Sequence, residues 1–296
     1  MHMKIGFIGL GIMGKPMSKN LVKAGLDLVV LDHKKAAMDE LAALGAETAP
    51  TPRAVAERTD VIFTMLPNSP QVKSVILEKD GVLEGARTGA LVVDASSIAP
   101  LVSREIGARL AERGVRFMDA PVSGGEPKAI DGTLSFMVGG READFAEARP
   151  LLAHMGSSAV LCGDVGAGNV TKLANQIIVA VNIAAVSEAL LLAAKAGVAP
   201  EKVFDAVKGG LAGSAALNAK APLIMDRKFD PGFRVNLHIK DLGNVLDTGH
   251  EVGAPLPLTA AVMEMMQTLR ADGHEMKDHG ALALYYEKLG DAEIKR

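Results

Sequence analysis

The chain has 296 residues, of which 49% are hydrophobic and 3% aromatic, and its formal net charge is −3 at pH 7. This length and apolar content are enough for two hydrophobic cores. No basic stripe interleaved with aromatic residues accompanies the nearly neutral charge, which argues against nucleic-acid binding. A single cysteine, Cys162, excludes an intramolecular disulfide framework and a multi-cysteine zinc site. We interpret it as a small buried residue in a reducing compartment.

The sequence carries no sign of a metal site or of a membrane segment. Its seven histidines form no H-x-x-x-H pair. The N-terminal run IGFIGLGIMG is too short and too rich in glycine to span a bilayer, and no charged leader with a cleavage site precedes it. We therefore expect a cytoplasmic protein that uses no metal and binds no membrane.

From Met3 to about Cys162, short β-branched runs alternate with stretches rich in alanine, leucine, lysine and glutamate. The predicted strands are IGFIGL, LDLVVLD, DVIFTML, GALVVDAS and VRFMDAPV, with TLSFMVGG and SAVLCG extending the sheet. Parallel strands need crossover connections, so this alternation predicts an α/β fold with a parallel sheet covered by helices on both faces.

The first predicted strand runs into glycines with the spacing G-x-G-x-x-G. In a strand-turn-helix unit, Gly9 would allow the tight turn, Gly11 the close approach of a pyrophosphate, and Gly14 the close packing of helix on strand. A helix that begins near Ile12 and Met13 would direct its free amides at the phosphates. The alternative is a turn whose glycines are purely structural. The candidate cofactor-binding residues of this turn are Gly9, Leu10, Gly11, Ile12, Met13 and Gly14.

Asp32 follows the second predicted strand, at the offset of about 20 residues where an acid can bond the adenosine ribose. A carboxylate there would repel the extra phosphate of NADP, so NAD is the expected cofactor. His33, Lys34 and Lys35 come next and would supply compensating positive charge if they turned inward. If these side chains are solvated instead, they do not compensate the carboxylate. NADP stays the alternative cofactor.

Two further turns follow strands at the edge of the sheet where ligands gather in open parallel sheets. Leu66, Pro67 and Asn68 follow the third predicted strand, and Ser96 and Ser97 follow the next. Proline, asparagine and serine are also ordinary turn residues. Their shared placement favours contact of Leu66, Pro67, Asn68 and Ser96 with the cofactor.

From about Asp164 the strand pattern gives way to long helical runs. The run from Val170 to Gly197 predicts one long helix that ends at a glycine. Its polar residues argue against a membrane span and favour a helix buried between domains or between subunits. A further helix is predicted over AAVMEMMQTLRADG. We predict a dinucleotide-binding domain over residues 1–163 and an all-helical substrate and oligomerisation domain over residues 164–296.

The long predicted helix carries polar residues on one face: Asn169, Lys172, and Asn175 or Gln176. A lone lysine is most often solvated. On an otherwise apolar helix, however, a lysine and amides on one face need polar surroundings. A lysine in a cleft can hold a carbonyl oxygen and give it a proton as hydride reaches the carbon.

Two other segments carry polar candidates. In DAPVSGG, the residues Ser123, Gly124 and Gly125 follow a strand and could present amides and a hydroxyl to a carboxylate, or form a plain glycine-rich turn. In NLHIKDLGN, Lys240 lies among apolar residues beside Asp241. It is either a functional group or a surface lysine.

The segments GFIGLGIMG, DAPVSGG, GAGNVTKLANQ and HIKDLGN, in this order over the whole chain, resemble the β-hydroxyacid dehydrogenase family. The resemblance implies a Rossmann-like domain joined to a helical domain, assembled as a homodimer or homotetramer. It implies that Lys172 is catalytic, that Asn175 orients the substrate and that Ser123–Gly125 anchors its carboxylate. Ser96 would contact the nicotinamide side, and Lys240 would close the site near cofactor and substrate.

Within this family, GGEPKAIDGTLSFMVGG and GGLAGSAAL resemble the branch of tartronate semialdehyde reductases. That branch implies reduction of a small carboxylate-bearing aldehyde, 2-hydroxy-3-oxopropanoate, to glycerate, in bacterial glucarate, galactarate or glyoxylate breakdown. Many relatives have Asn-Arg where this chain has Asp32-His33, which puts a strict NADP preference in doubt.

Three alternatives are weighed against this function. A relative of the same family would act on 3-hydroxyisobutyrate, glyoxylate or succinic semialdehyde. A non-catalytic dinucleotide-binding module would need neither Lys172 nor the SGG turn. The short-chain dehydrogenase scheme is disfavoured because neither Tyr285 nor Tyr286 is followed by lysine four residues later.

Overall fold

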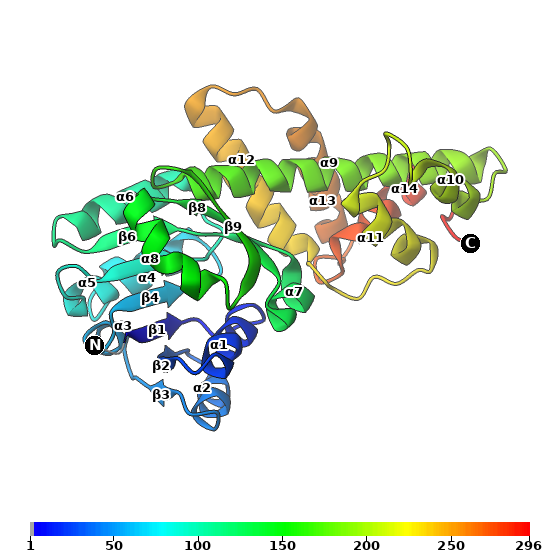
Figure 1. Cartoon of the computed structure of the whole chain (residues 1–296). Helices are drawn as coiled ribbons and strands as arrows, with labels where there is room; N and C mark the ends of the chain where they lie inside the picture. The colour runs from blue at the N-terminus through cyan, green and yellow to red at the C-terminus, as the bar shows by residue number, and fades with distance from the viewer. Residues whose placement is uncertain (1–2) are drawn as a thin grey trace. The chain divides into compact units, whose positions relative to one another are not determined.

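The computed structural model describes residues 3–296, and the chain divides into two compact units. The first unit ends at Lys172 and the second begins at Leu173. This boundary lies inside one long helix, α9 (Ala167–Lys195), which is drawn in light green in Figure 1. The domain boundary predicted after Gly163 lies just before that helix.

Strands and helices alternate through the first unit (Figure 1). Its strands are β1 (Lys4–Ile8), β2 (Asp27–Leu31), β3 (Glu47–Thr48), β4 (Val61–Thr64), β5 (Leu91–Asp94), β6 (Arg116–Asp119), β7 (Val122–Ser123), β8 (Leu134–Gly139) and β9 (Gly156–Gly163). Its helices before α9 are α1 (Gly14–Lys23), α2 (Lys35–Ala42), α3 (Pro52–Ala56), α4 (Ser69–Leu77), α5 (Val82–Gly85), α6 (Pro100–Ala111), α7 (Gly125–Asp131) and α8 (Glu142–Leu152). All the predicted strands form, while β3 and β7, of two residues each, are too short to show a period in the sequence.

One sheet runs in the order β3-β2-β1-β4-β5-β6-β8-β7, with β9 paired to β8. The strands from β3 to β6 are parallel, which confirms the predicted parallel sheet. The direction reverses at β8, which pairs antiparallel with β6 and β7, and the sequence pattern did not predict this reversal. In the parallel part, the register places Thr64, Asp94 and Asp119 side by side at the carboxyl ends of β4, β5 and β6.

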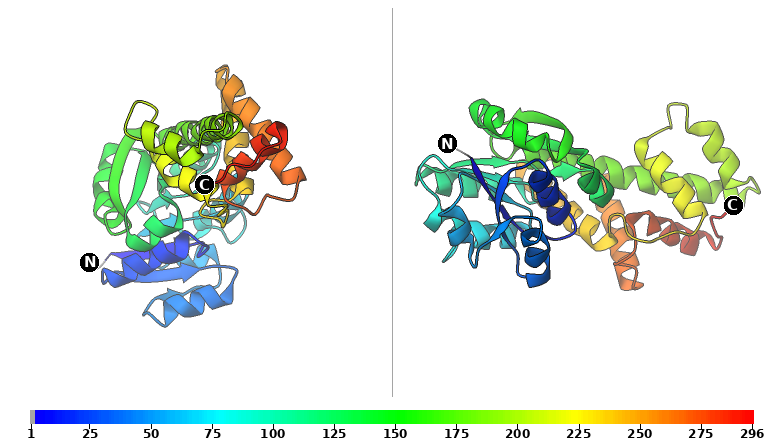
Figure 2. Two further views of the ribbon diagram at one scale, coloured as in Figure 1. Left: turned by 90° about the vertical axis from the view of Figure 1, so that its right-hand side faces the viewer. Right: turned by 60° about the horizontal axis from the view of Figure 1, so that its bottom comes forward.

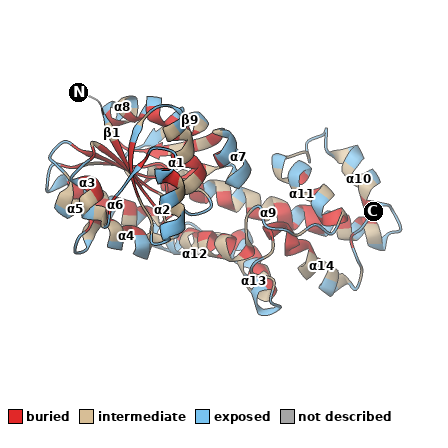
Figure 3. Ribbon diagram, turned by 90° about the horizontal axis from the view of Figure 1, so that it is seen from below, coloured by how far each residue is buried: buried red, intermediate tan, exposed pale blue. Residues whose placement is uncertain are grey.

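Helices cover both faces of the sheet, as predicted. Alternate residues of one strand enter two separate cores: Leu91 and Val93 of β5 pack with α1, α7 and α8, whereas Val92 packs with α3, α4 and α6. Every residue of β4 and β5 is buried, and Figure 3 shows the buried strands radiating through this unit. Burial on both faces explains why these strands read as continuous apolar runs.

The interpretation of Cys162 as a buried residue is wrong, because its side chain is exposed. Cys162 lies in β9, whose residues are all half-buried or exposed. The thiol contacts the carbonyl oxygen of Val160 at 3.4 Å. An apolar strand pattern therefore does not report whether a strand lies inside or at the border of a sheet.

Every described element between Leu173 and Arg296 is helical (Figure 2). After α9 come α10 (Pro200–Val207), α11 (Ala215–Met225), α12 (Val235–Val252), α13 (Pro257–Ala271), a single 3-10 turn η1 (His279–Ala281) and α14 (Leu282–Gly290). The predicted helix over AAVMEMMQTLRADG is confirmed by α13. Two apolar clusters form the core of this unit: one lies among α9, α12, α13 and α14, and the other takes in α11 and the buried Ile294.

By length and composition alone, α9 could cross a membrane, and it is the one such helix among residues 3–296. Core helices of soluble proteins pass the same test. Gln176 and Ser187 are buried polar residues within α9, and both side chains are hydrogen-bonded inside the protein. The bond of Gln176 to Asp241 of the second unit fits a core helix, because a lipid-facing helix would leave this amide unpaired, whereas the bond of Ser187 lies within α9 itself.

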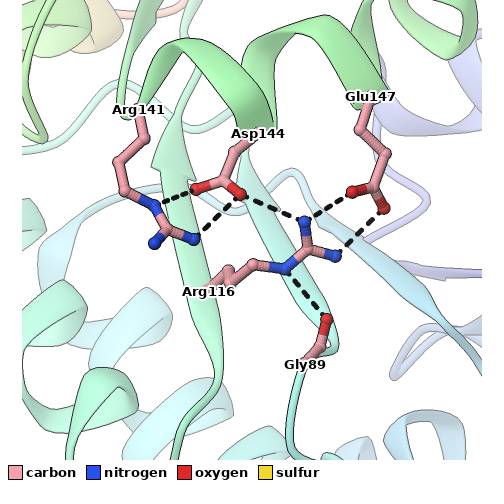
Figure 4. Close-up of polar contacts among 5 residues, drawn as sticks. All are labelled: Gly89, Arg116, Arg141, Asp144 and Glu147. Atoms are coloured by element: carbon pink, nitrogen blue, oxygen red, sulfur yellow. Dashed lines mark hydrogen bonds and ion pairs between the residues drawn. The ribbon is translucent and has the colours of Figure 1, made fainter.

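A charged network closes the amino-terminal edge of the sheet (Figure 4). Asp144 of α8 accepts hydrogen bonds from Arg116 Nη1 at 3.1 Å and from Arg141 Nε at 2.7 Å. Arg116, the first residue of β6, also donates to Glu147 and, from Nε, to the carbonyl oxygen of Gly89 at 2.9 Å. The bond to Glu147 raises the pKa of Arg116. The network fastens α8 to the sheet on the edge away from the polar turns.

Asp144→Ala is expected to lower the free energy of unfolding by about 1–3 kcal/mol, because it removes charge-assisted bonds at a carboxylate that is only 2% exposed. The remaining bond of Arg116 to Glu147 limits the loss. Urea unfolding measures the change. Asp205→Ala is the matched control, since Asp205 forms an exposed pair with Lys208, and we expect no measurable change there. Equal effects of the two substitutions would contradict the prediction.

Candidate functional site

The glycines of the first turn have three different surroundings. Gly9 has φ +98° and a Cβ there would collide with the carbonyl oxygen of Met65, while a Cβ on Gly14 would collide with the carbonyl oxygen of Gly9. A Cβ on Gly11 would meet nothing within 4 Å. Packing of the chain therefore requires Gly9 and Gly14, but it does not require Gly11. The open space over Gly11 can receive a pyrophosphate.

Helix α1 begins at Gly14, slightly later than predicted, and Met13 is its N-cap residue without a side-chain cap. The amides of the first turn therefore receive no side-chain acceptor from the N-cap position. This leaves the positive end of α1 next to the open space over Gly11, which suits a phosphate.

Asp32 directly follows β2, and its side chain is 6% exposed. Its Oδ2 accepts a hydrogen bond from the amide of Leu10 at 2.6 Å, and its Oδ1 accepts one from the amide of Lys34 at 2.7 Å. The carboxylate is thus fixed to the glycine turn. His33, Lys34 and Lys35 are exposed. Lys35 pairs with Asp39, whereas His33 Nδ1 lies 3.2 Å from Asp32 Oδ1, so the His33 side chain does reach this carboxylate.

The turns that follow β4 and β5 are joined by hydrogen bonds. The amide of Leu66 donates to Ser96 Oγ at 2.9 Å, and Asp94 Oδ1 accepts from Thr64 Oγ1 at 2.7 Å and from the amide of Ser96 at 3.1 Å. Ser96 and Asp94 are fully buried. Burial raises the pKa of Asp94 to about 6, against the lowering effect of the bonds from Ser96 and Thr64. Asn68 is the N-cap residue of α4. These hydrogen bonds fix the backbone path of both turns. The side chain of Ser96 itself is not exposed.

The SGG turn joins β7 to α7: Ser123 ends β7, Gly124 lies between the two elements and Gly125 begins α7. Gly124 and Gly125 have φ values of +139° and +68°, a conformation that favours glycine, and a Cβ on Gly124 would contact the Lys128 side chain at 2.7 Å. Ser123 is half-buried and Gly124 is exposed. Backbone amides and a hydroxyl are therefore accessible here without bulky side chains, an arrangement that can hold a carboxylate.

The first turn of α9 is held by a buried carboxylate at the end of β6. Asp119 accepts hydrogen bonds from the amide of Gly166 at 2.6 Å and from the amide of Asn169 at 2.7 Å. Burial raises the pKa of Asp119 to about 6, although these amides act in the opposite direction. Lys172 follows one turn later and is 7% exposed. The candidate catalytic lysine thus belongs to a helix start that is anchored to the sheet.

Asn169 does not share the polar face that the helical spacing suggested. Its side chain is fully buried in the first unit, where Oδ1 accepts from the amide of Ile98 at 3.1 Å and Nδ2 donates to Ser103 Oγ at 3.0 Å. A buried amide turns toward partners that can satisfy it. The spacing argument could not detect those partners, because both lie in a distant part of the sequence.

The second unit brings together the other polar candidates of α9 and α12. Gln176 is buried and donates to Asp241 Oδ2 at 2.6 Å, and Asn175 Nδ2 donates to Gln176 Oε1 at 2.8 Å. Lys240 Nζ lies 2.8 Å from Asp241 Oδ1, and its side chain is 20% exposed. Lys240 is therefore not a freely solvated surface lysine, and Asn175, Gln176 and Asp241 form one chain of contacts with it.

Sequence reasoning missed two kinds of buried polar group. Asp94 and Asp119 were not singled out, although an acidic residue that ends an apolar strand is a visible signal in LVVD and RFMD. His238 and His279 form a buried pair with 2.9 Å between their Nδ1 atoms. No local sequence pattern predicts that pair, because the two residues are far apart in the chain.

Gly11→Ala is expected to fold like the parent, because the added Cβ meets nothing in the protein, and to weaken NADH binding at least 10-fold by filling the space for the pyrophosphate. Fluorescence titration with NADH measures the affinity, and thermal unfolding measures the fold. Gly14→Ala is the contrasting variant: its Cβ collides with Gly9, so stability falls. Unchanged NADH affinity in Gly11→Ala would assign the pyrophosphate to another place.

Family models match the two halves of the chain. Residues 4–165 match the NAD binding domain of 6-phosphogluconate dehydrogenase, and residues 166–286 match the NAD-binding region of NADP-dependent 3-hydroxyisobutyrate dehydrogenase. Among curated proteins, 2-hydroxy-3-oxopropionate reductase of Escherichia coli is 44% identical over 99% of this chain and 100% of its own length.

Solved structures agree with these matches. The 3-hydroxyisobutyrate dehydrogenase of Mycobacterium tuberculosis with L-serine superposes with a TM-score of 0.91 at 34% identity, over 97% of this chain and 99% of that one. Psf3 in complex with NADP+ and 2-OPP has a TM-score of 0.84 at 25% identity, over 96% and 99% of the two chains. The glycine turn, the fixed Asp32 and these similarities lead to one conclusion: the chain belongs to the β-hydroxyacid dehydrogenase family and is an NAD(P)-dependent oxidoreductase.

Proposed function

We propose that this enzyme reduces 2-hydroxy-3-oxopropanoate, also called tartronate semialdehyde, to glycerate. The observation that carries the proposal is the identity of 44% over the full length of a 2-hydroxy-3-oxopropionate reductase. The accessible SGG turn supports it, because a small substrate with a carboxylate next to the reacting carbons needs an anchor of backbone amides. The second candidate is a 3-hydroxyisobutyrate dehydrogenase, which the structural similarity at 34% identity favours.

In the proposed reaction, the bound reduced nicotinamide supplies the hydride to the aldehyde carbon. Ser123, Gly124 and Gly125 hold the substrate carboxylate. This binding fixes the orientation of the aldehyde for the reaction. Lys172 Nζ donates a hydrogen bond to the aldehyde oxygen and transfers its proton as negative charge develops there. Asn175 and Lys240 keep, as proposals, the roles that the family resemblance implies: Asn175 orients the substrate and Lys240 closes the site.

The choice of cofactor follows from the fixed carboxylate of Asp32. Its two amide bonds leave it no freedom to move away from a ribose that binds at the glycine turn. A 2′-phosphate there would meet the negative charge of Asp32, while Lys34 is solvated, Lys35 is paired with Asp39, and the imidazole of His33 lies 3.2 Å from the Asp32 carboxylate itself. We therefore propose that NADH is preferred over NADPH by at least ~10-fold, the factor that corresponds to ~1.4 kcal/mol.

Oxidation of NADH and NADPH, followed with tartronate semialdehyde, glyoxylate and succinic semialdehyde, tests both proposals. The reverse reaction is measured with glycerate and 3-hydroxyisobutyrate. We expect the highest kcat/KM for tartronate semialdehyde with NADH. A higher value for 3-hydroxyisobutyrate would favour the second candidate, and equal use of NADPH would reject the role of Asp32 while leaving the substrate assignment intact.

Lys172→Ala is expected to lower kcat by ~10²–10⁴-fold, the usual range for a group that acts as general acid and stabilises the oxyanion. Lys172→Arg should not restore activity, because arginine keeps the charge but does not give up a proton. NADH titration is the control that each variant is folded and binds its cofactor. A kcat within a few-fold of the parent in a protein that binds NADH would remove Lys172 from the mechanism.

Assembly as a homodimer or homotetramer, and a cytoplasmic location, stay predictions. The exposed apolar side chains of Ile178 and Leu192 on α9, which are 62% and 71% exposed, favour association between copies of the chain. Light scattering in solution measures the oligomeric state, and a monomer would overturn the first of these predictions.

A further inference from the structure

One buried residue, Asn169, links the start of α9 to three other segments of the first unit, two through its side chain and one through its backbone amide. Asn169 bonds the amide of Ile98, in the turn after β5, and the hydroxyl of Ser103 in α6. Its own amide bonds Asp119, the residue from which the DAPVSGG segment leaves the sheet. Lys172 lies three residues further along the same helix.

We propose that Asn169 is a positioning residue for the reaction: its side chain fixes the helix of Lys172 to the turn that carries Ser96. The inference rests on the proposed catalytic role of Lys172. Asn169 does not act on a reacting atom. It sets the position of Lys172 relative to the turn that carries Ser96.

The short path between the two residues makes this coupling effective. Three residues of α-helix correspond to a rise of about 4.5 Å, and backbone hydrogen bonds keep that stretch rigid. A shift of Asn169 therefore displaces Lys172 by a similar amount. A displacement of about 1 Å at a reacting group can lower a rate 10²-fold.

The chemistry of the site selects asparagine. The amide of Ile98 needs a hydrogen-bond acceptor, and Ser103 Oγ accepts a hydrogen bond from a donor. A carboxamide supplies both the acceptor and the donor. Aspartate would lose the donor and add a charge beside the buried Asp119. Glutamine would need more room at a position with no exposed surface. Alanine keeps the helix but leaves the amide of Ile98 unpaired.

Hydrogen exchange of the protein without cofactor or substrate tests the anchoring directly. In Asn169→Ala we expect faster exchange in peptides that cover residues 94–100 and 164–172, because the bonds that tie them together are lost. Ser187→Ala is the matched control, since Ser187 is also buried in α9 but its hydroxyl donates to the carbonyl oxygen of Ile183 in the same helix. Parent-like exchange in Asn169→Ala would overturn the anchoring.

Steady-state kinetics test the effect on chemistry. Asn169→Ala should lower kcat by about 10- to 100-fold while the Kd for NADH changes less than about 3-fold. The deuterium isotope effect measured with NADH labelled at the transferred position should rise, because the chemical step becomes slower. A merely structural loss would reduce the fraction of active enzyme and leave the isotope effect unchanged, and that result would reject the positioning role.

Ser103→Ala keeps the test decisive if Asn169→Ala fails to fold. It removes one of the two side-chain partners, and we expect a kcat about 3-fold lower with a raised isotope effect. A parent-like kcat and isotope effect would overturn the proposal. If the parent does not reduce tartronate semialdehyde, the substrate assignment fails, and the kinetics are repeated with the acid or aldehyde that it does turn over.

Discussion

The carboxylate of Asp119 accepts hydrogen bonds from two backbone amides at the start of α9, those of Gly166 and Asn169. The candidate site is arranged around this contact. Helix and sheet can meet so closely because Gly139 and Gly168 carry no side chain. A Cβ on either glycine would lie within 3 Å of Asp119. The parallel register then places Asp119 beside Asp94, so the lysine helix, the SGG segment and the turn with Ser96 all start from neighbouring strand ends. Their relative positions are set by the sheet rather than by flexible loops.

Burial of the carboxylates of Asp119 and Asp94 lowers stability at neutral pH. Burial raises the pKa of both Asp94 and Asp119 from 3.8 to about 6, so the folded protein holds these protons more tightly than the unfolded chain. The stabilising contribution is complete below about pH 4 and is lost as the pH rises through about 6. Above that range each ionised carboxylate costs on the order of 3 kcal/mol. The hydrogen bonds that Asp119 and Asp94 accept lower these pKa values and so keep the cost from being larger, and they hold a geometry that an apolar pair could not provide.

The sequence predicts this fold well wherever one strand or one turn decides the outcome. The strands from β1 to β6 lie between two helical layers, and burial on both faces leaves the apolar runs that identify them. The surroundings of Gly11 and Gly14 likewise follow from a local strand-turn-helix unit, whereas Gly9 packs against the carbonyl oxygen of Met65, far away in the chain. The reversal at β8, the exposure of Cys162 and the inward turn of Asn169 depend on partners far away in the chain. Periodicity carries no information about such partners, so those features needed the structure.

The two edges of the sheet show how stability and function are separated. At the amino-terminal edge, Asp144 has two arginine partners, and this pairing strengthens the attachment of α8. At the carboxyl edge, Asp94 Oδ2 is buried and no hydrogen-bond partner for it lies among residues 3–296. An unpaired buried oxygen is tolerated where the surrounding bonds hold a required geometry. Here those bonds, from Thr64 and Ser96, hold the turn of the candidate site that follows β5. The edge of the sheet that carries the candidate site is therefore the one that gives up stability, while the opposite edge is strengthened by charge pairs.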